Sequence, residues 1–159
     1  MHAEIRIDTG DFDVAREWQA CRTRLAGRAG AVVAFAGIVR DHAGGDEVNG
    51  LYLEHYPGMT EASIERILAT ASDRWDLIDT VVIHRVGELA PGDQIVLVLV
   101  AAAHRGDAFA ACEYIMDYLK TDAVFWKKER RSTGASWIRA TAGDHERRNG
   151  WQADDGRTD

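Results

Sequence analysis

The sequence predicts an α+β domain with a mixed, largely antiparallel sheet, three main helices and a C-terminal β-hairpin. Apolar runs of strand length separate three segments with helical spacing, and the elements follow the order β-α-β-β-α-β-β-α-β-β. The chain has 159 residues, 46% of them hydrophobic, which is enough to bury a core. No linker divides it, so residues 1–151 are expected to form a single domain.

The first half of the chain alternates short strands with helices. Residues 4–8 alternate polar and apolar side chains, as does the segment 51–56, and both are predicted as strands. Residues 31–40 form a β-branched, apolar strand, and the three glycines of residues 41–50 predict a mobile loop after it. Apolar side chains at helical spacing predict a helix over about residues 11–26 (Val14, Trp18, Cys21 and Leu25).

The second half repeats this organisation. A helical stripe follows Pro57-Gly58, and a third helix follows Gly106-Asp107 (Ile64, Ile67, Leu68, Ala71 and Trp75; Phe109, Cys112, Met116 and Leu119). Further strands are predicted at residues 80–86 and 95–103, and two more form a hairpin around the turn 132–134 (residues 124–131 and 135–141). From Asp144 the chain is polar apart from Trp151 and is expected to be loose, with residues 152–159 a disordered tail.

Charge is distributed unevenly along this acidic chain. The formal net charge is −7, yet the segment 120–148 carries eight basic and four acidic residues and is +4, which leaves −11 for the remainder. An acidic protein is poorly suited to neutralising nucleic-acid phosphates, so no nucleic-acid partner is expected. A local positive field suits a small anion.

The sequence also predicts a cytoplasmic protein without a membrane partner. The longest apolar runs span about nine residues, whereas crossing a bilayer takes about 20. The N-terminus lacks the basic start and apolar core of a secretory signal. Cys21 and Cys112 show no CxxC spacing, which favours small core residues in a reducing compartment.

The candidate functional residues are cations at the ends of elements. Lys120 lies at the end of the third predicted helix, and Lys127 and Lys128 flank Trp126 in a strand, so these two point to opposite faces. His104-Arg105 closes a strand before a helix N-terminus, where anions often bind, and Arg40 closes another strand. Taken singly, each cation also fits a structural role, as a helix-end lysine, a solvated strand face or a polar strand terminus.

The other histidines do not predict a metal site. His42, His55, His84 and His145 are scattered, with no pair at helical ligand spacing and no neighbouring cysteine. His55 and His84 lie in strands, where they fit either a polar face or a hydrogen bond in the core. GxSxG, P-loop and dinucleotide-binding patterns are absent from the sequence.

Several segments resemble the large catalytic subunit of molybdopterin synthase, the MoaE family. The strings Leu-Glu-His-Tyr-Pro-Gly-Met (53–59) and Met-Asp-Tyr-Leu-Lys-Thr (116–121) are the most specific. The resemblance spans roughly residues 3–151, and the matching segments are Gly30–Asp41, Leu53–Thr60, Ile83–Leu89, Ala103–Arg105, Tyr114–Thr121 and Phe125–Glu129.

This resemblance implies an α/β-hammerhead fold and a homodimer flanked by two small ubiquitin-like sulfur-carrier subunits, a heterotetramer. The implied sulfurtransferase reaction converts cyclic pyranopterin monophosphate (precursor Z) to the molybdopterin dithiolene in molybdenum cofactor biosynthesis. Sulfur arrives as a thiocarboxylate on the carrier's C-terminal Gly-Gly tail. The resemblance implies neither a metal nor a cofactor for this step.

The resemblance also places substrate contacts on specific residues (Ile38, Val39, Arg40, His104, Arg105, Lys120, Lys127, Lys128 and Glu129). Of these, Lys120 is expected at the terminus of the carrier tail and Lys127 against the pterin or its phosphate, and both are the expected catalytic residues. Arg40, His104 and Arg105 would hold the phosphate, with the last two supplied by the neighbouring chain of the dimer. Arg139, the basic residue of the last strand, receives no role. The alternative function is a non-catalytic α+β module that binds a phosphorylated metabolite.

Overall fold

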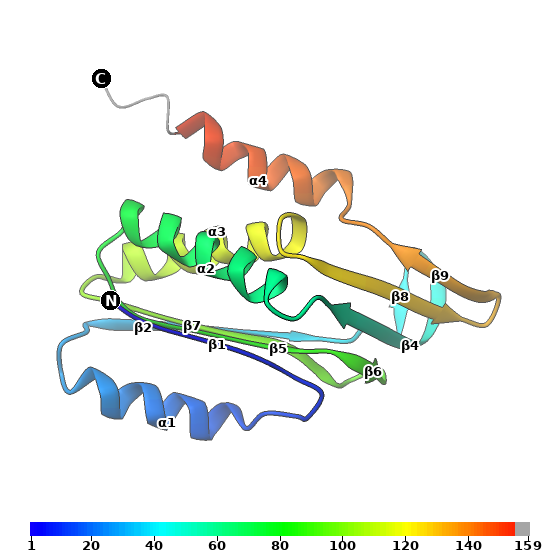
Figure 1. Cartoon of the computed structure of the whole chain (residues 1–159), viewed down its shortest axis with the longest axis horizontal. Coiled ribbons are helices and arrows are strands. Elements are labelled where there is room, and N and C mark those ends of the chain that lie inside the picture. Colours follow the sequence, from blue (N-terminus) through cyan, green and yellow to red (C-terminus); the bar gives the residue numbers. More distant parts are fainter. Residues whose placement is uncertain (155–159) are drawn as a thin grey trace.

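The computed structural model describes residues 1–154, which form four helices and nine strands (Figure 1). The helices are α1 (Val14–Leu25), α2 (Met59–Arg74), α3 (Arg105–Thr121) and α4 (Ala142–Asp154). The strands are β1 (His2–Asp8), β2 (Ala31–Ile38), β3 (His42–Ala43), β4 (Asp46–His55), β5 (Leu77–Arg85), β6 (Gly87–Leu89), β7 (Gln94–Ala102), β8 (Phe125–Arg131) and β9 (Gly134–Ile138). Across this described part of the chain, none of the helices has the length and apolarity needed to span a bilayer.

The first sheet has the order β1-β5-β7-β2 and is covered by helices on both faces (Figure 1). β1 runs parallel to β5, and β7 runs antiparallel to both β5 and β2. Val96, Val98 and Val100 of β7 pack in the core under α2 and α3. The alternate residues Leu97 and Leu99 pack against α1 on the other face. A strand buried on both sides must be apolar at every position, which explains the continuous apolar run of β7.

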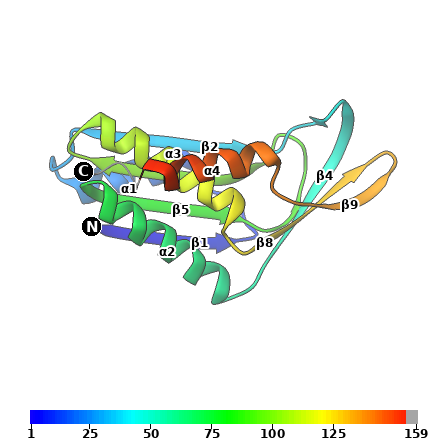
Figure 2. The same ribbon diagram turned by 90° about the horizontal axis from the view of Figure 1, so that it is seen from above.

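The second sheet has the order β3-β4-β8-β9, with β6 also paired to β4. β4 and β8 are antiparallel, and Leu53 lies opposite Lys127. Figure 2 shows the arm of β4, β8 and β9 extending past the end of the first sheet. An apolar cluster joins the two sheets (Val39, Leu51, Leu53, Val86 and Leu89). The predicted α+β fold of hammerhead type is confirmed, as are the three main helices and the C-terminal hairpin.

The predicted loose segment from Asp144 is wrong as far as Asp154, because residues 142–154 form α4. α4 packs on α3 through ion pairs, of which Arg147–Asp117 and Arg148–Asp122 each measure 3.0 Å. The indole Nε1 of Trp151 also donates a hydrogen bond to Asp117 at 2.8 Å. Tertiary contacts therefore stabilise a helix whose one large apolar residue is Trp151. The rest of the predicted tail, residues 155–159, lies outside the described residues.

The expected mobile loop at residues 41–50 is also wrong, because this segment is a tight hairpin. β3 pairs with the start of β4, and the two residues of the turn are Gly44 and Gly45. Their φ values are 62° and 89°, a left-handed conformation that favours glycine. The glycines thus mark a defined turn.

Candidate functional site

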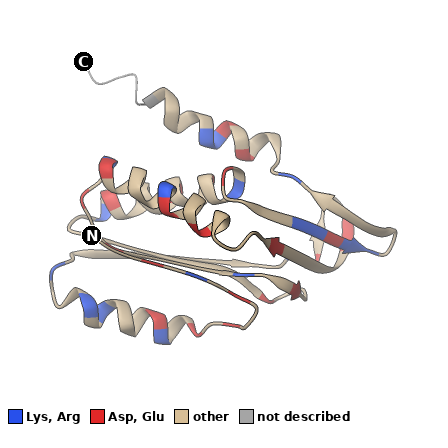
Figure 3. Ribbon diagram, in the orientation of Figure 1, with Lys and Arg blue, Asp and Glu red and all other residues tan. Residues whose placement is uncertain are grey.

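Lys127 on β8 is the centre of a group of cations drawn from distant parts of the sequence. Burial lowers the pKa of its ammonium group, and the nearby charges of Lys120 and Arg40 lower it further, against the opposing effect of Glu129. Lys120 comes from the last turn of α3, and Arg40 lies two residues after β2. Figure 3 shows basic residues on β8 and on the neighbouring end of α3. One chain therefore brings three predicted site residues into one electrostatic neighbourhood.

The backbone around Val39 explains how Arg40 reaches this place. The side chain of Val39 is buried between the two sheets. Its amide donates to the carbonyl of Asp93 at 2.9 Å, and its own carbonyl accepts from Gly92 at 2.8 Å. Val39 is therefore a fixed point, while Ile38 on one side is 55% exposed and Arg40 on the other is exposed. Of the predicted trio, Val39 anchors the chain, and the other two present side chains to solvent.

Glu129 lies two residues after Lys127 on β8 and is buried. Its carboxylate accepts two hydrogen bonds from Arg131, at 2.8 Å from Nη2 and 3.1 Å from Nε. The same charge raises the pKa of Lys127. Glu129 therefore acts as a fixed counter-charge in this neighbourhood, because the guanidinium of Arg131 holds its carboxylate in place.

Lys128 does not join Lys127, because successive side chains of a strand point to opposite faces. Its ammonium group lies 5.5 Å from the ring centre of Trp137, on the other side of the second sheet. Within one chain, Lys128 therefore does not lie in the same site as Lys127, contrary to the sequence-based assignment. The alternation predicted for the two lysines is confirmed.

His104 and Arg105 are also separated from the cations around Lys127. They lie at the N-terminal end of α3, whereas Lys120 lies in its last turn. Fifteen helical steps from Arg105 to Lys120 correspond to about 22 Å along the helix axis. Both side chains are exposed. The structure of one chain thus leaves His104 and Arg105 at a different end of the molecule.

His84 forms a buried floor beneath this neighbourhood, a role that the sequence left open between core and surface. Its ring stacks on Phe125, with ring centres 4.0 Å apart and planes inclined at 22°. Its Nδ1 lies 2.8 Å from the carbonyl oxygen of Arg85 and must donate to it, which leaves Nε2 with a lone pair. Burial lowers the pKa of His84 to about 4, with smaller contributions from Lys127 and His55. His84 is therefore a neutral core hydrogen-bonder. Across residues 1–154 no group of three His, Cys, Asp or Glu side chains is arranged to hold a metal ion.

Asp144, at the start of α4, is the site neighbour that sequence reasoning missed. Its Oδ1 lies 3.4 Å from the Nζ of Lys120. The pattern Thr141-Ala-Gly-Asp144 is a variant of the capping signal that begins many helices, and it was the available clue to both the helix and the carboxylate.

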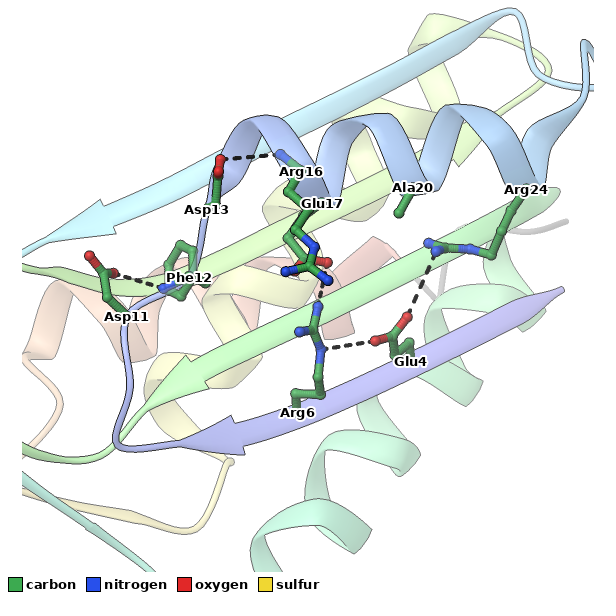
Figure 4. A pocket seen from close by; sticks show the side chains of 9 residues that line it. All are labelled: Glu4, Arg6, Asp11, Phe12, Asp13, Arg16, Glu17, Ala20 and Arg24. Carbon is green, nitrogen blue, oxygen red and sulfur yellow. Dashed lines mark hydrogen bonds and ion pairs between the residues drawn. The ribbon is translucent and has the colours of Figure 1, made fainter.

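A groove of about 500 Å³ lies elsewhere, between α1 and β1 (Figure 4). Arg6 pairs there with both Glu4 and Glu17, and Arg24 lies 3.8 Å from Glu4. Figure 4 shows these side chains directed at one another across the groove. Because its charges are mutually neutralised, the groove offers little net attraction to an anion, unlike the cations around Lys127.

Comparisons with known proteins give one consistent result. A family model described as "MoaE protein" matches residues 7–122. The molybdopterin synthase catalytic subunit of Ralstonia nicotianae is 56% identical over 142 residues, covering 88% of this chain and 79% of the relative. Its counterpart in Vibrio cholerae is 51% identical over 152 residues, covering 96% of this chain and all of the relative. The solved structure of a molybdopterin biosynthesis MoaE protein from Burkholderia ambifaria is 50% identical, with a TM-score of 0.81 over 94% of this chain and 98% of that one.

Proposed function

Since the chain belongs to the MoaE protein family, whose members are catalytic subunits of molybdopterin synthase, we propose that the cations around Lys127 form the site of its reaction. The activity is a sulfur transfer in molybdenum cofactor biosynthesis. It converts cyclic pyranopterin monophosphate (precursor Z) to molybdopterin, with sulfur from the thiocarboxylated C-terminus of a small sulfur-carrier subunit. That carrier is the protein partner.

The observation that carries the site is the meeting of Arg40, Lys120 and Lys127 in an acidic chain. The substrate contributes a phosphate and the carrier contributes an anionic tail, so the reaction brings two negative groups together. Cations held in a partly desolvated place offset that repulsion and stabilise the charge that develops during acyl transfer. The paired charges of the groove at α1 provide no such field.

The environments of the two lysines suggest different roles. Lys120 is the more exposed and stands at a helix end, where the thiocarboxylate tail can approach it and where its ammonium can stabilise the tetrahedral anion. Lys127 is the more desolvated, and its lowered pKa makes it the better suited of the two to transfer a proton. Arg40 would bind the phosphate, beside the exposed apolar side chain of Ile38.

The experiment compares Lys120→Ala and Lys127→Ala with Lys128→Ala in an assay of dithiolene formation from precursor Z and thiocarboxylated carrier. We expect the first two variants to lose about 100-fold to 1,000-fold in rate, the usual effect of removing a group that stabilises transition-state charge. Lys128→Ala is the matched control, because this lysine lies on the opposite face of β8, and it should retain most activity.

Near-normal turnover of both Lys120→Ala and Lys127→Ala would overturn the proposed site. A protein that only senses a phosphorylated metabolite would instead lose affinity for precursor Z in these variants and show no turnover before substitution. Carrier binding should be measured in parallel, so that a lost docking contact is not counted as a lost chemical step.

The assembly and location follow as further parts of the proposal. We expect a homodimer with one carrier per chain, and the neighbouring chain would supply His104 and Arg105 to the cations around Lys127. A cytoplasmic location is supported by Cys21 and Cys112, which are both free and buried. Burial raises the pKa of the Cys112 thiol to about 11, so this cysteine has the character of an inert core residue.

A further inference from the structure

We propose that Asp144 is the counter-ion of Lys120. Its carboxylate holds the lysine in place and is displaced when the anionic tail of the sulfur carrier binds. The inference rests on the proposed function and adds a positioning residue to it. It places the control of Lys120 in α4, an element with no assigned part in the reaction.

The carboxylate of Asp144 is fixed by the first turn of α4. Its Oδ2 accepts hydrogen bonds from the backbone amide of Thr141 at 2.9 Å and from the Thr141 hydroxyl at 2.8 Å. The hydroxyl oxygen in turn accepts from the backbone amide of Asp144 at 3.1 Å. This reciprocal cap occupies one carboxylate oxygen and leaves Oδ1 to face the Nζ of Lys120 at 3.4 Å.

α4 itself is attached along the length of α3, so Asp144 does not depend on its cap alone for its position. Arg147 binds Asp117, and Arg148 binds Asp122. Farther along, Trp151 packs edge-to-face on Tyr114, with ring centres 5.6 Å apart. α4 and the lysine-bearing helix α3 therefore form one unit.

The charge state and exposure of the two groups allow exchange. Burial raises the pKa of Asp144, but the hydrogen bonds from Thr141 and the charge of Lys120 outweigh this effect, so the net pKa is lowered. Asp144 is thus an anion at neutral pH. Its side chain is 19% exposed, whereas that of Lys120 is 57% exposed, which leaves one side of the ammonium open to a second anion. An ion pair with so exposed a partner is weak enough to be replaced.

The test is the kinetics of Asp144→Asn, which keeps a cap acceptor but removes the charge. We expect KM for the carrier to fall about threefold to fivefold, because Lys120 then attracts the tail without a competitor. We expect kcat to fall by about the same factor, because the lysine loses its anchor. Asp144→Glu keeps the charge and should return KM to within about twofold of the unaltered chain.

Glu113→Gln is the matched control. It removes another ion pair between α3 and α4, Arg147–Glu113 at 2.6 Å, seven residues before Lys120 along α3. If α4 matters only as a structural support, both variants should lose thermal stability alike and KM should rise or stay constant. A KM for Asp144→Asn that does not fall below that of Glu113→Gln overturns the proposal.

A second measurement uses the purified chain without carrier or precursor Z. An acylating reagent must reach the Nζ of Lys120, which the Asp144 carboxylate holds at 3.4 Å in the unaltered chain. Mass spectrometry should therefore show faster labelling of Lys120 in Asp144→Asn, relative to Lys128 in the same sample. An unchanged ratio overturns the proposal, whatever the activity. The labelling ratio can also rise while the unaltered chain transfers no sulfur. That result would support the pairing of Asp144 with Lys120 and would contradict only the proposed function.

Discussion

His84 shows how one buried residue protects the electrostatics of the site. It stacks under Phe125, two residues before Lys127, and its pKa is lowered to about 4 mainly by burial. A charged imidazole here would oppose Lys127, so a neutral ring is the form that the site tolerates. The sequence identified His84 as a strand residue, but its neutrality depends on desolvation by segments far away in the chain. The residues next to His84 in the sequence do not show whether its side chain is buried.

This residue predicts how stability depends on pH. The pKa of His84 is lowered from 6.5 to about 4 on folding, so the folded chain binds this proton more weakly than the unfolded chain. The stability that depends on neutral His84 is fully present above pH 6.5 and is lost as the pH falls toward 4, by roughly 3 kcal/mol at most. Denaturant unfolding between pH 4 and 8 should show this loss.

His84→Phe retains a ring for stacking but does not titrate, so its stability should vary less with pH across that range. His145→Phe provides the control, because His145 is exposed on α4. If His84→Phe and the unaltered chain lose equal free energy between pH 6.5 and 4, another group is responsible for the acid sensitivity.

At the scale of elements, the sequence predicts the helices and strands that have a regular spacing of apolar residues. β7 was recognised by its apolar run, the β8–β9 hairpin by alternation around a turn, and the opposite directions of Lys127 and Lys128 by the same alternation. α4 escaped because Trp151 is its one large apolar residue, so no apolar stripe marks a buried face. Its stability comes from partners on α3, and such contacts appear only once the fold is formed.

The attachment of α4 can be measured with Trp151→Ala. This indole packs on Trp75 and Tyr114 and donates a hydrogen bond to Asp117. Its loss should reduce the free energy of unfolding by about 2 kcal/mol, less than for a fully buried tryptophan because Trp151 is half-buried. Hydrogen exchange should also become faster along α4.

Gln152→Ala, an exposed change on the same helix, should leave both quantities nearly unaltered. If α4 holds Lys120 through Asp144, Trp151→Ala should additionally lower kcat. Unchanged exchange rates along α4 would show that the ion pairs to α3 hold the helix without Trp151.

At the scale of the whole molecule, one chain supplies only part of the predicted cation set. Arg40, Lys120 and Lys127 meet, whereas His104 and Arg105 lie about 22 Å away along α3. The predicted third helix already implied this separation, because His104-Arg105 precede it and Lys120 ends it. What sequence order could not reveal is which end of α3 faces β8. The edge strand β2 leaves Phe35 and Ile38 exposed near Arg40, an apolar edge of the kind that proteins usually cover. A second chain there would account for both features.

Mixed dimers provide the decisive test of this shared site. Lys127→Ala and Arg105→Ala, each expected to have little activity alone, are unfolded together, refolded as a mixture and assayed for dithiolene formation. If each site takes Lys127 from one chain and Arg105 from the other, half of the dimers are mixed and each has one intact site, so roughly a quarter of the unaltered activity should return. Mixing Lys127→Ala with Lys120→Ala is the control. Each site takes both lysines from the same chain, so every site in this mixed dimer lacks one of them and no activity should return. If activity returns only in the first mixture, Arg105 acts across the dimer. If the first mixture is no more active than its two components, the site is confined to one chain.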